Sequence, residues 1–124
     1  MLKHLQALEA TQPYTTLDGS TIRELMHPAV HGNRAQSLAE ARLAVGARTA
    51  RHRHREAEEI YFVLAGEGEM ELAGEAFVVR SGDTICIPPG TPHAIRNIGA
   101  SELRFLCCCA PAYRHDDTEL LDAS

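Results

Sequence analysis

The chain of 124 residues has no apolar run long enough to cross a membrane, because its longest apolar stretches are only strand-sized. The first ten residues, MLKHLQALEA, also lack the long apolar segment of a signal peptide. We therefore expect a cytoplasmic protein with no membrane partner. The length suits one domain with its own core and is too short for two independent domains.

A surplus of basic side chains is also missing. The formal net charge is -5, whereas binding to nucleic acid needs a concentrated basic surface, so we expect no nucleic-acid partner. The only local basic cluster consists of Arg51, Arg53 and Arg55, which alternate with His52 and His54. In a strand these arginines would point away from the histidines. We expect them to face solvent rather than to attract an anion to a site.

Cysteines are few and poorly spaced for a metal site. They are Cys86 and the run Cys107, Cys108 and Cys109. Consecutive strand residues point to opposite faces, so the run cannot close around one ion. A cytoplasmic protein also rarely forms structural disulfides. We expect small buried hydrophobic side chains here, with a redox-sensitive thiol as the alternative.

Helix-length amphipathic periodicity is absent from the middle of the chain, where glycines separate short strand-like stretches. Residues 37–45 alternate, with Glu40 and Arg42 on one face and a more apolar set on the other, namely Ser37, Ala39, Ala41, Leu43 and Val45. Further strands are predicted at 50–54, 59–65, 68–73, 76–79, 84–87, 93–98 and 102–109. Many short strands joined by tight turns favour an all-β sandwich or barrel.

The amino-terminal third carries turn signals instead of long periodic segments. After a short helix, Pro13 and the pair Asp18-Gly19 predict a hairpin or turn around residues 14–25. Residues 26–36 are expected to form a loop. The histidines outside the central region are expected to be ordinary surface or core residues; these are His4, His27, His31 and His115.

Two histidines at strand spacing indicate a metal site. His52 and His54 would emerge on one face of a strand, about 6 to 7 Å apart along the chain, and this separation can span an ion. A turn at 55–58 would then bring a glutamate beside them, either Glu58 or Glu59.

Alternate residues of a strand point to opposite faces, and this strand parity distinguishes the two glutamates. Glu59 shares its face with Tyr61 and Val63, whereas Glu58 shares the more apolar face of residues 60, 62 and 64. Because we expect the more apolar face to pack against the core, we predict that Glu59 is the carboxylate that points toward the histidines.

A second polar cluster follows at residues 82–97, GDTICIPPGTPHAIRN. Pro88, Pro89 and Gly90 force a turn, because proline cannot continue a strand ladder. His93 then opens the next strand. If the sheet closes into a barrel, His93 would complete a set of three histidines and one glutamate.

These two clusters resemble the two motifs of the cupin family. The first motif, G-x5-H-x-H-x4-E-x6-G, is matched at every spacing by Gly46, His52, His54, Glu59 and Gly66. The second, G-x5-P-x-G-x2-H-x3-N, is matched by Gly82, Pro88, Gly90, His93 and Asn97. The final spacing of the first motif independently selects Glu59, because seven residues on from Glu58 lies Ala65 rather than a glycine.

The resemblance implies an all-β double-stranded β-helix, a small jelly-roll barrel, with short helical or irregular terminal segments. We expect an arm at 1–35, the barrel at 36–112 and a tail at 113–124. The resemblance also implies a metal held by His52, His54, Glu59 and His93, and a homodimer, for which residues 14–25 are our candidate contact. Asn97 is expected to be a hydrogen-bonding partner inside the barrel rather than a ligand.

Three imidazoles and one carboxylate suit one divalent transition metal, such as Fe, Mn, Ni, Co or Zn, better than calcium or magnesium. Four ligands around a six-coordinate ion leave two positions for a small-molecule substrate, alone or with dioxygen. We therefore expect a metal-dependent enzyme of dioxygenase or isomerase/cyclase type that acts on a small polar, oxygen-chelating substrate.

In such an enzyme Glu59 could act as a base, and Tyr61 could offer its hydroxyl to substrate instead of simply packing. Strand parity counts against contributions from Gln36 and Arg42. A non-catalytic module that binds a sugar or small metabolite stays open, as does a structural scaffold, because fold does not determine function.

Overall fold

The computed structural model describes residues 3–122, which form strands joined by turns, two short 3-10 helices and no α-helix. The 3-10 helices are η1 (Leu8–Ala10) and η2 (His115–Asp117). The strands are β1 (Tyr14–Thr15), β2 (Thr21–Met26), β3 (Ser37–Leu43), β4 (His52–His54), β5 (Glu58–Ala65), β6 (Glu67–Leu72), β7 (Glu75–Arg80), β8 (Thr84–Ile87), β9 (His93–Asn97), β10 (Leu103–Ala110) and β11 (Thr118–Leu120).

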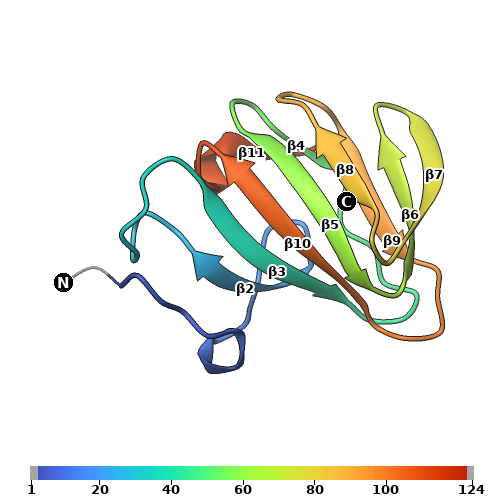
Figure 1. The fold of residues 1–124 in the computed structure, drawn as a ribbon. Coiled ribbons are helices and arrows are strands. Elements are labelled where there is room, and N and C mark those ends of the chain that lie inside the picture. The colour runs from blue at the N-terminus through green and yellow to red at the C-terminus, as the bar shows by residue number, and fades with distance from the viewer. Residues whose placement is uncertain (1–2, 123–124) are drawn as a thin grey trace.

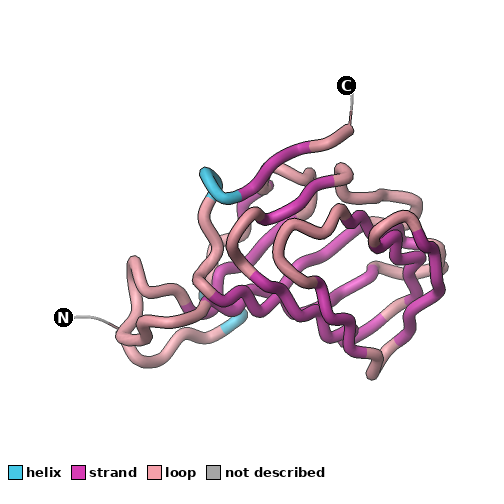
Figure 2. The backbone as a smooth tube through the Cα atoms, turned by 90° about the horizontal axis from the view of Figure 1, so that it is seen from above, coloured by secondary structure: helices cyan, strands magenta, loops and turns pink. Residues whose placement is uncertain are grey.

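The strands build two antiparallel sheets (Figure 1). The larger sheet has the order β1-β2-β3-β10-β5-β8 and the smaller one β11-β4-β9-β6-β7. Seen from above, the strands surround an interior, and the loops of the described amino-terminal segment lie to one side of it (Figure 2). The prediction of an all-β jelly-roll barrel is confirmed.

The core and the pocket occupy successive stretches of the same strands. Along β5 the inward side chains change from Glu59 and Tyr61, which line a pocket, to Val63 in the apolar core. Along β3 the small residues Ala39 and Ala41 line the pocket and Leu43 closes the core. Burying each large apolar side chain contributes about 1.5–3 kcal/mol. The apolar core therefore stabilises the strands whose other stretch lines the pocket.

The predicted strands agree with the structure except at their ends. The hairpin at 14–25 is confirmed, with Tyr14 opposite Ile22 and Thr15 opposite Thr21. The predicted amino-terminal helix is only the single turn η1. Val45, predicted to face the core, is 59% exposed because β3 ends at Leu43. Within the predicted tail, residues 118–120 form the strand β11, which was not predicted and which pairs with β4.

Glu40 lies on the face of β3 opposite the core residues Ala39 and Ala41, as predicted, but arginine side chains cover it there. Its side chain is fully buried, and its carboxylate accepts hydrogen bonds from Arg42 Nε at 2.6 Å and Arg104 Nε at 3.1 Å. Burial alone would raise the pKa of Glu40, but the hydrogen bonds from the two arginines outweigh burial and hold the pKa below its ordinary value. The alternation of residues along the sequence could not show that the Glu40 carboxylate is paired with two arginines.

Glu59 is the glutamate that points inward, as predicted, but the reason differs from the one expected from strand parity. Glu59, Tyr61 and Val63 do point inward, as predicted. However, Ile60 is 44% exposed and Phe62 is 39% exposed, so the more apolar face of β5 is the outer face of the barrel. The core lies on the same side as the glutamate. The spacing of the first motif, not the parity of β5, identified Glu59 correctly.

Other predictions about single residues are confirmed. Asn97 donates to the carbonyls of Leu43 and Ser101 and accepts from the Gly99 amide, so it ties loops together inside the barrel. Arg55 is exposed and Arg53 is half-buried, and both pair with Glu119. The remaining histidines have ordinary environments: His4 is exposed, whereas hydrogen bonds satisfy His27, His31 and His115.

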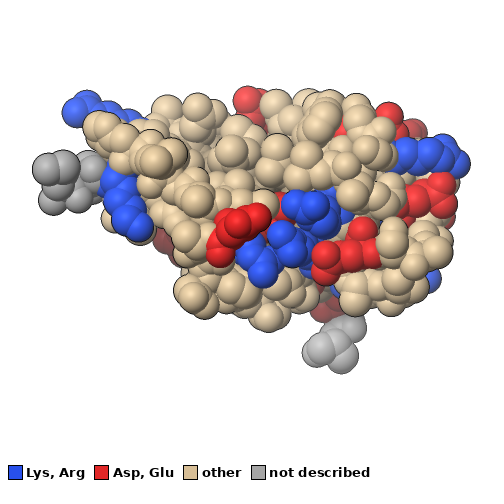
Figure 3. All heavy atoms as spheres, turned by 60° about the horizontal axis from the view of Figure 1, so that its bottom comes forward, with Lys and Arg blue, Asp and Glu red and all other residues tan. Residues whose placement is uncertain are grey.

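Charges of both signs are mixed on the surface. Figure 3 shows acidic and basic side chains next to one another on the face that it displays. Among residues 3–122, no helix has the length and apolar character needed to cross a membrane.

Candidate metal centre

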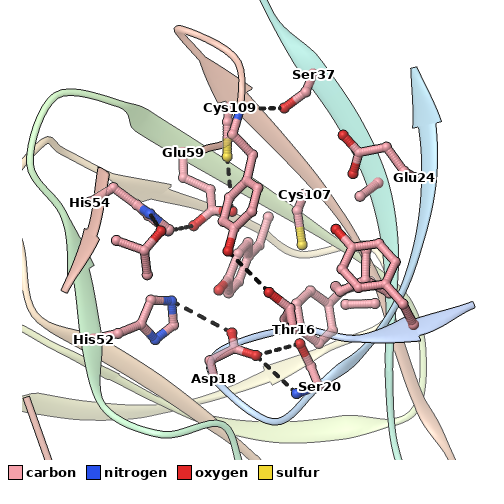
Figure 4. A pocket seen from close by; sticks show the side chains of 18 residues that line it. Thr16, Asp18, Ser20, Glu24, Ser37, His52, His54, Glu59, Cys107 and Cys109 are labelled. Atoms are coloured by element: carbon pink, nitrogen blue, oxygen red, sulfur yellow. Dashed lines mark hydrogen bonds and ion pairs between the residues drawn. The ribbon is translucent and has the colours of Figure 1, made fainter. Parts of the chain in front are cut away.

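The four predicted ligands come together at one point of the barrel. His52 and His54 lie on β4, Glu59 begins the inward face of β5, and His93 opens β9 directly opposite His52. One potential ligand atom from each residue lies within 4.8 Å of the others, and all four side chains are buried. Figure 4 shows His52, His54 and Glu59 pointing into a common space. The sequence prediction that these residues converge is therefore right, although their role as ligands stays a prediction.

Hydrogen bonds fix the tautomers of two histidines. Nδ1 of His52 lies 2.8 Å from the carbonyl oxygen of Ala50, and Nδ1 of His93 lies 2.9 Å from that of Thr91. A carbonyl can only accept, so each Nδ1 must carry the proton. In the neutral ring, Nε2 is then the nitrogen free to bind an ion.

A series of two hydrogen bonds holds His54 in the same tautomer. Its Nδ1 lies 3.0 Å from the Thr118 hydroxyl, which in turn lies 3.0 Å from the carbonyl oxygen of Arg114. Because the hydroxyl proton is used toward that carbonyl, the Thr118 oxygen accepts from His54 Nδ1. The neutral forms of all three histidines therefore present Nε2 to the common space. Thr118 belongs to the predicted tail and was missed in the sequence.

We expect the Thr118→Val variant to bind a divalent transition metal about 10- to 100-fold more weakly than the wild type, as removal of a partner that orients a metal-binding histidine commonly does. Thr118→Ser keeps the hydroxyl and serves as the matched control, with nearly unchanged affinity. Competitive titration of zinc against a chelator measures both constants. Equal affinities for the valine and serine variants would show that this hydrogen bond does not orient His54.

The charges at the cluster also favour a bound cation. Burial alone would raise the pKa of Glu59, but the hydrogen bond from His54 and the nearby imidazoles of His54 and His93 hold it well below its ordinary value. Burial would lower the pKa of His54, but the hydrogen bond to Glu59 at 3.1 Å raises it overall. Burial and the neighbouring His93 lower the pKa of His52.

One buried nitrogen in the cluster has no partner. His93 Nε2 makes no hydrogen bond to any of the described residues and lies 3.4 Å from Glu59 Oε1. A buried polar atom without a partner carries a cost of about 1–3 kcal/mol. A divalent transition ion would satisfy this nitrogen together with the other two Nε2 atoms and the Glu59 carboxylate. The residues present therefore fit the metal that the sequence predicts.

The pocket around the cluster contains residues that sequence reasoning missed. The pocket is open to solvent, and its empty volume of about 530 Å³ includes part of that open space. Alternate residues of the amino-terminal hairpin form one wall: Tyr14, Thr16, Asp18, Ser20, Ile22 and Glu24. The predicted tail adds Tyr113 and Thr118. The hairpin that we assigned to a dimer contact is thus part of the pocket, and the dimer contact itself stays a prediction.

Two of the four cysteines lie beside the cluster. Cys107 and Cys109 are buried as predicted, whereas Cys108 is half-buried and Cys86 is exposed, so the prediction is wrong for Cys86. The Cys109 thiol donates to Glu59 Oε2 at 3.2 Å, while Oε1 of the same carboxylate faces the histidines. Burial raises the pKa of both inward thiols, which keeps them protonated and weakly nucleophilic.

Tyr61 lies in the pocket, whereas Gln36 and Arg42 do not line it, as parity indicated. The Tyr61 ring packs between Phe105, at a centroid distance of 4.7 Å, and His93, at 6.0 Å. Burial raises the pKa of Tyr61 well above its ordinary value, so its hydroxyl stays a neutral hydrogen-bond donor.

A single jelly-roll barrel that gathers three histidines and one glutamate at its open end defines a small single-domain cupin. Comparison with known families agrees, because the cupin domain matches residues 39–109, more than half of the chain. The chain belongs to the cupin family.

Similar proteins differ in what they are said to do. An uncharacterized protein of Methanocaldococcus jannaschii is 54% identical over 90% of this chain and 89% of its own length. An oxalate-binding protein of Thermotoga maritima is 33% identical over 68% of this chain and 65% of its own length. The polyketide cyclase RemF of Streptomyces resistomycificus has the same fold, with a TM-score of 0.81, 22% identity and coverage of 100% of this chain and 88% of RemF. Cupins similar to this chain thus include enzymes.

Proposed function

We propose that this cupin is a metal-dependent enzyme that acts on a small polar substrate chelating through oxygen atoms. The observation that carries the proposal is the convergence of three imidazole Nε2 atoms and one carboxylate in a buried pocket. This donor set suits Fe, Mn, Ni, Co or Zn in the divalent state. When bound, such an ion would act as a Lewis acid and lower the pKa of a substrate hydroxyl or adjacent C–H group.

The chain's own side chains would hold and orient the substrate. Tyr61 has a neutral hydroxyl at the pocket wall and is our candidate for donating a hydrogen bond to a substrate oxygen. Glu59 is stabilised as a carboxylate, which suits a ligand, and it could serve as a base only after leaving that position. The buried, apolar residues Phe105 and Ala41 border the same space and limit the access of water.

Two reaction types remain in the proposal. Reaction of the activated substrate with dioxygen would make the protein a dioxygenase, whereas return of a proton at another atom would make it an isomerase or cyclase. The likeness to a polyketide cyclase supports the second type at the level of fold only. The oxalate-binding relative supports a second candidate function, a module that binds a small molecule without turnover.

Metal exchange separates these functions. The protein is stripped with a chelator and reloaded anaerobically with Fe(II), or with Mn, Ni, Co or Zn as separate samples. Oxygen uptake and product formation are then followed with diketones, catechols, flavonols and thiol acids. We expect turnover that disappears on chelation and returns on reloading. Saturable binding without turnover for every metal would establish a binding module and contradict the enzyme proposal.

We also propose that the protein acts as a cytoplasmic homodimer. Sedimentation equilibrium measures its mass in solution directly. A monomer at micromolar concentration would contradict the dimer.

A further inference from the structure

The pocket is acidic and rich in hydroxyl groups. Among its lining residues are three carboxylates, Asp18, Glu24 and Glu59, and none of the described lining residues is a lysine or an arginine. Asp18 and Glu59 alone would balance the charge of a divalent ion, even before Glu24 is counted. A dianionic ligand such as oxalate would therefore enter a site without a surplus of positive charge.

Asp18 is held rigidly over the cluster. Its Oδ1 accepts hydrogen bonds from the Ser20 amide at 2.9 Å and from the Ser20 hydroxyl at 2.6 Å, and Ser20 is itself fully buried. The backbone carbonyl of Asp18 accepts from the Ala50 amide at 2.7 Å, two residues before His52. These contacts aim Oδ2 at the cluster, 3.6 Å from His52 Nε2 (Figure 4).

A metal at the cluster would leave Asp18 Oδ2 available as an acceptor. His52 Nδ1 carries its proton toward Ala50, so Nε2 facing an ion has no proton to offer Asp18. No hydrogen bond from any described residue reaches Oδ2. Asp18 is also outside the group of four residues whose ligand atoms lie within 4.8 Å of one another. It is thus placed to contact a ligand in the pocket rather than to hold the ion.

We propose that Asp18 selects an uncharged ligand with neighbouring hydroxyl groups, such as a catechol, an enediol or a 1,2-diol, and disfavours dicarboxylates. One hydroxyl of this ligand would donate to Asp18 Oδ2, and its oxygens would face the metal site. This inference rests on the proposed function and narrows its substrate class. The proposed ligand class differs from oxalate, the ligand in the name of the Thermotoga maritima relative.

The test uses zinc-loaded protein and calorimetric titration with two probes, catechol and oxalate. Metal content is measured first for wild type, for Asp18→Asn and for Glu69→Gln, a control that removes one exposed carboxylate outside the pocket. We expect equal zinc content in all three and tighter binding of catechol than of oxalate by the wild type. Asp18→Asn should weaken catechol binding about tenfold or more, since a hydrogen bond to a charged acceptor is lost, and should tighten oxalate binding. Glu69→Gln should change neither.

Each contrary result has a distinct meaning. A wild type that takes up no zinc would overturn the proposed function and this inference together. A zinc-loaded wild type that prefers oxalate or fails to bind catechol would overturn this inference alone. The same holds if Asp18→Asn has the same ratio of catechol affinity to oxalate affinity as the wild type. Loss of zinc from Asp18→Asn with retention in Glu69→Gln would make Asp18 a metal ligand and would also overturn it.

Discussion

The His54→Ala variant is expected to lose metal binding and, with it, all metal-dependent activity. His54 supplies one Nε2 atom and keeps Glu59 Oε1 in place at 3.1 Å. Removing a residue that orients a ligand costs about 10- to 100-fold in metal affinity, so removing the ligand itself should cost more than about 100-fold. Elemental analysis after dialysis against trace zinc gives the metal content per chain.

Two further variants make this result interpretable. His4→Ala removes an exposed histidine outside the pocket and should keep full metal content. His54→Gln keeps a polar side chain and guards against a simple failure of the alanine variant to fold. If a folded His54 variant retains its metal and its function, the site assignment is wrong.

Gly66→Ala is expected to destabilise the fold much more than Gly82→Ala. Both glycines have φ of +93°, which costs an alanine about 1–2 kcal/mol. A Cβ at Gly66 would also lie 2.9 Å from both the Glu102 carbonyl oxygen and the Leu103 Cα, whereas nothing lies within 4 Å of a Cβ at Gly82. Forced movement of backbone adds about 1–3 kcal/mol, so Gly66→Ala should lose about 2–5 kcal/mol in total.

Urea unfolding of both variants measures this difference, with Gly82→Ala as the matched control for backbone conformation. The contact explains why a glycine is needed at the end of the first motif: β5 turns there against β10. Equal losses for the two variants would show that conformation alone, and not the close approach, requires glycine at this position.

The ligand cluster could be predicted from strand geometry together with the spacings of the two motifs. Residues two apart in a strand share a face, so His52 and His54 had to point the same way. Fixed spacings then identified Glu59 and His93. The inward direction of each side chain followed from motif spacing, whereas reading hydrophobicity along β5 alone would have assigned its outer face, with Ile60 and Phe62, to the core.

The wall of the pocket could not be predicted because it depends on long-range pairing. Asp18 reaches His52 across 34 positions of sequence, and Thr118 reaches His54 across 64. The turn signals around residues 14–25 predict a hairpin but do not say which space its side chains enter. In the same way, no local pattern shows that Glu40 is buried against Arg104 from β10.

The most direct test of the account is X-ray absorption at the zinc edge of metal-loaded wild type. Three imidazoles and one carboxylate predict nitrogen and oxygen neighbours at about 2.0–2.2 Å, with the outer-shell scattering of histidine rings. Zinc-sulfur scattering at about 2.3 Å, which Cys107 or Cys109 would produce, would contradict the proposed centre. A spectrum without the scattering of histidine rings would also contradict the proposed centre.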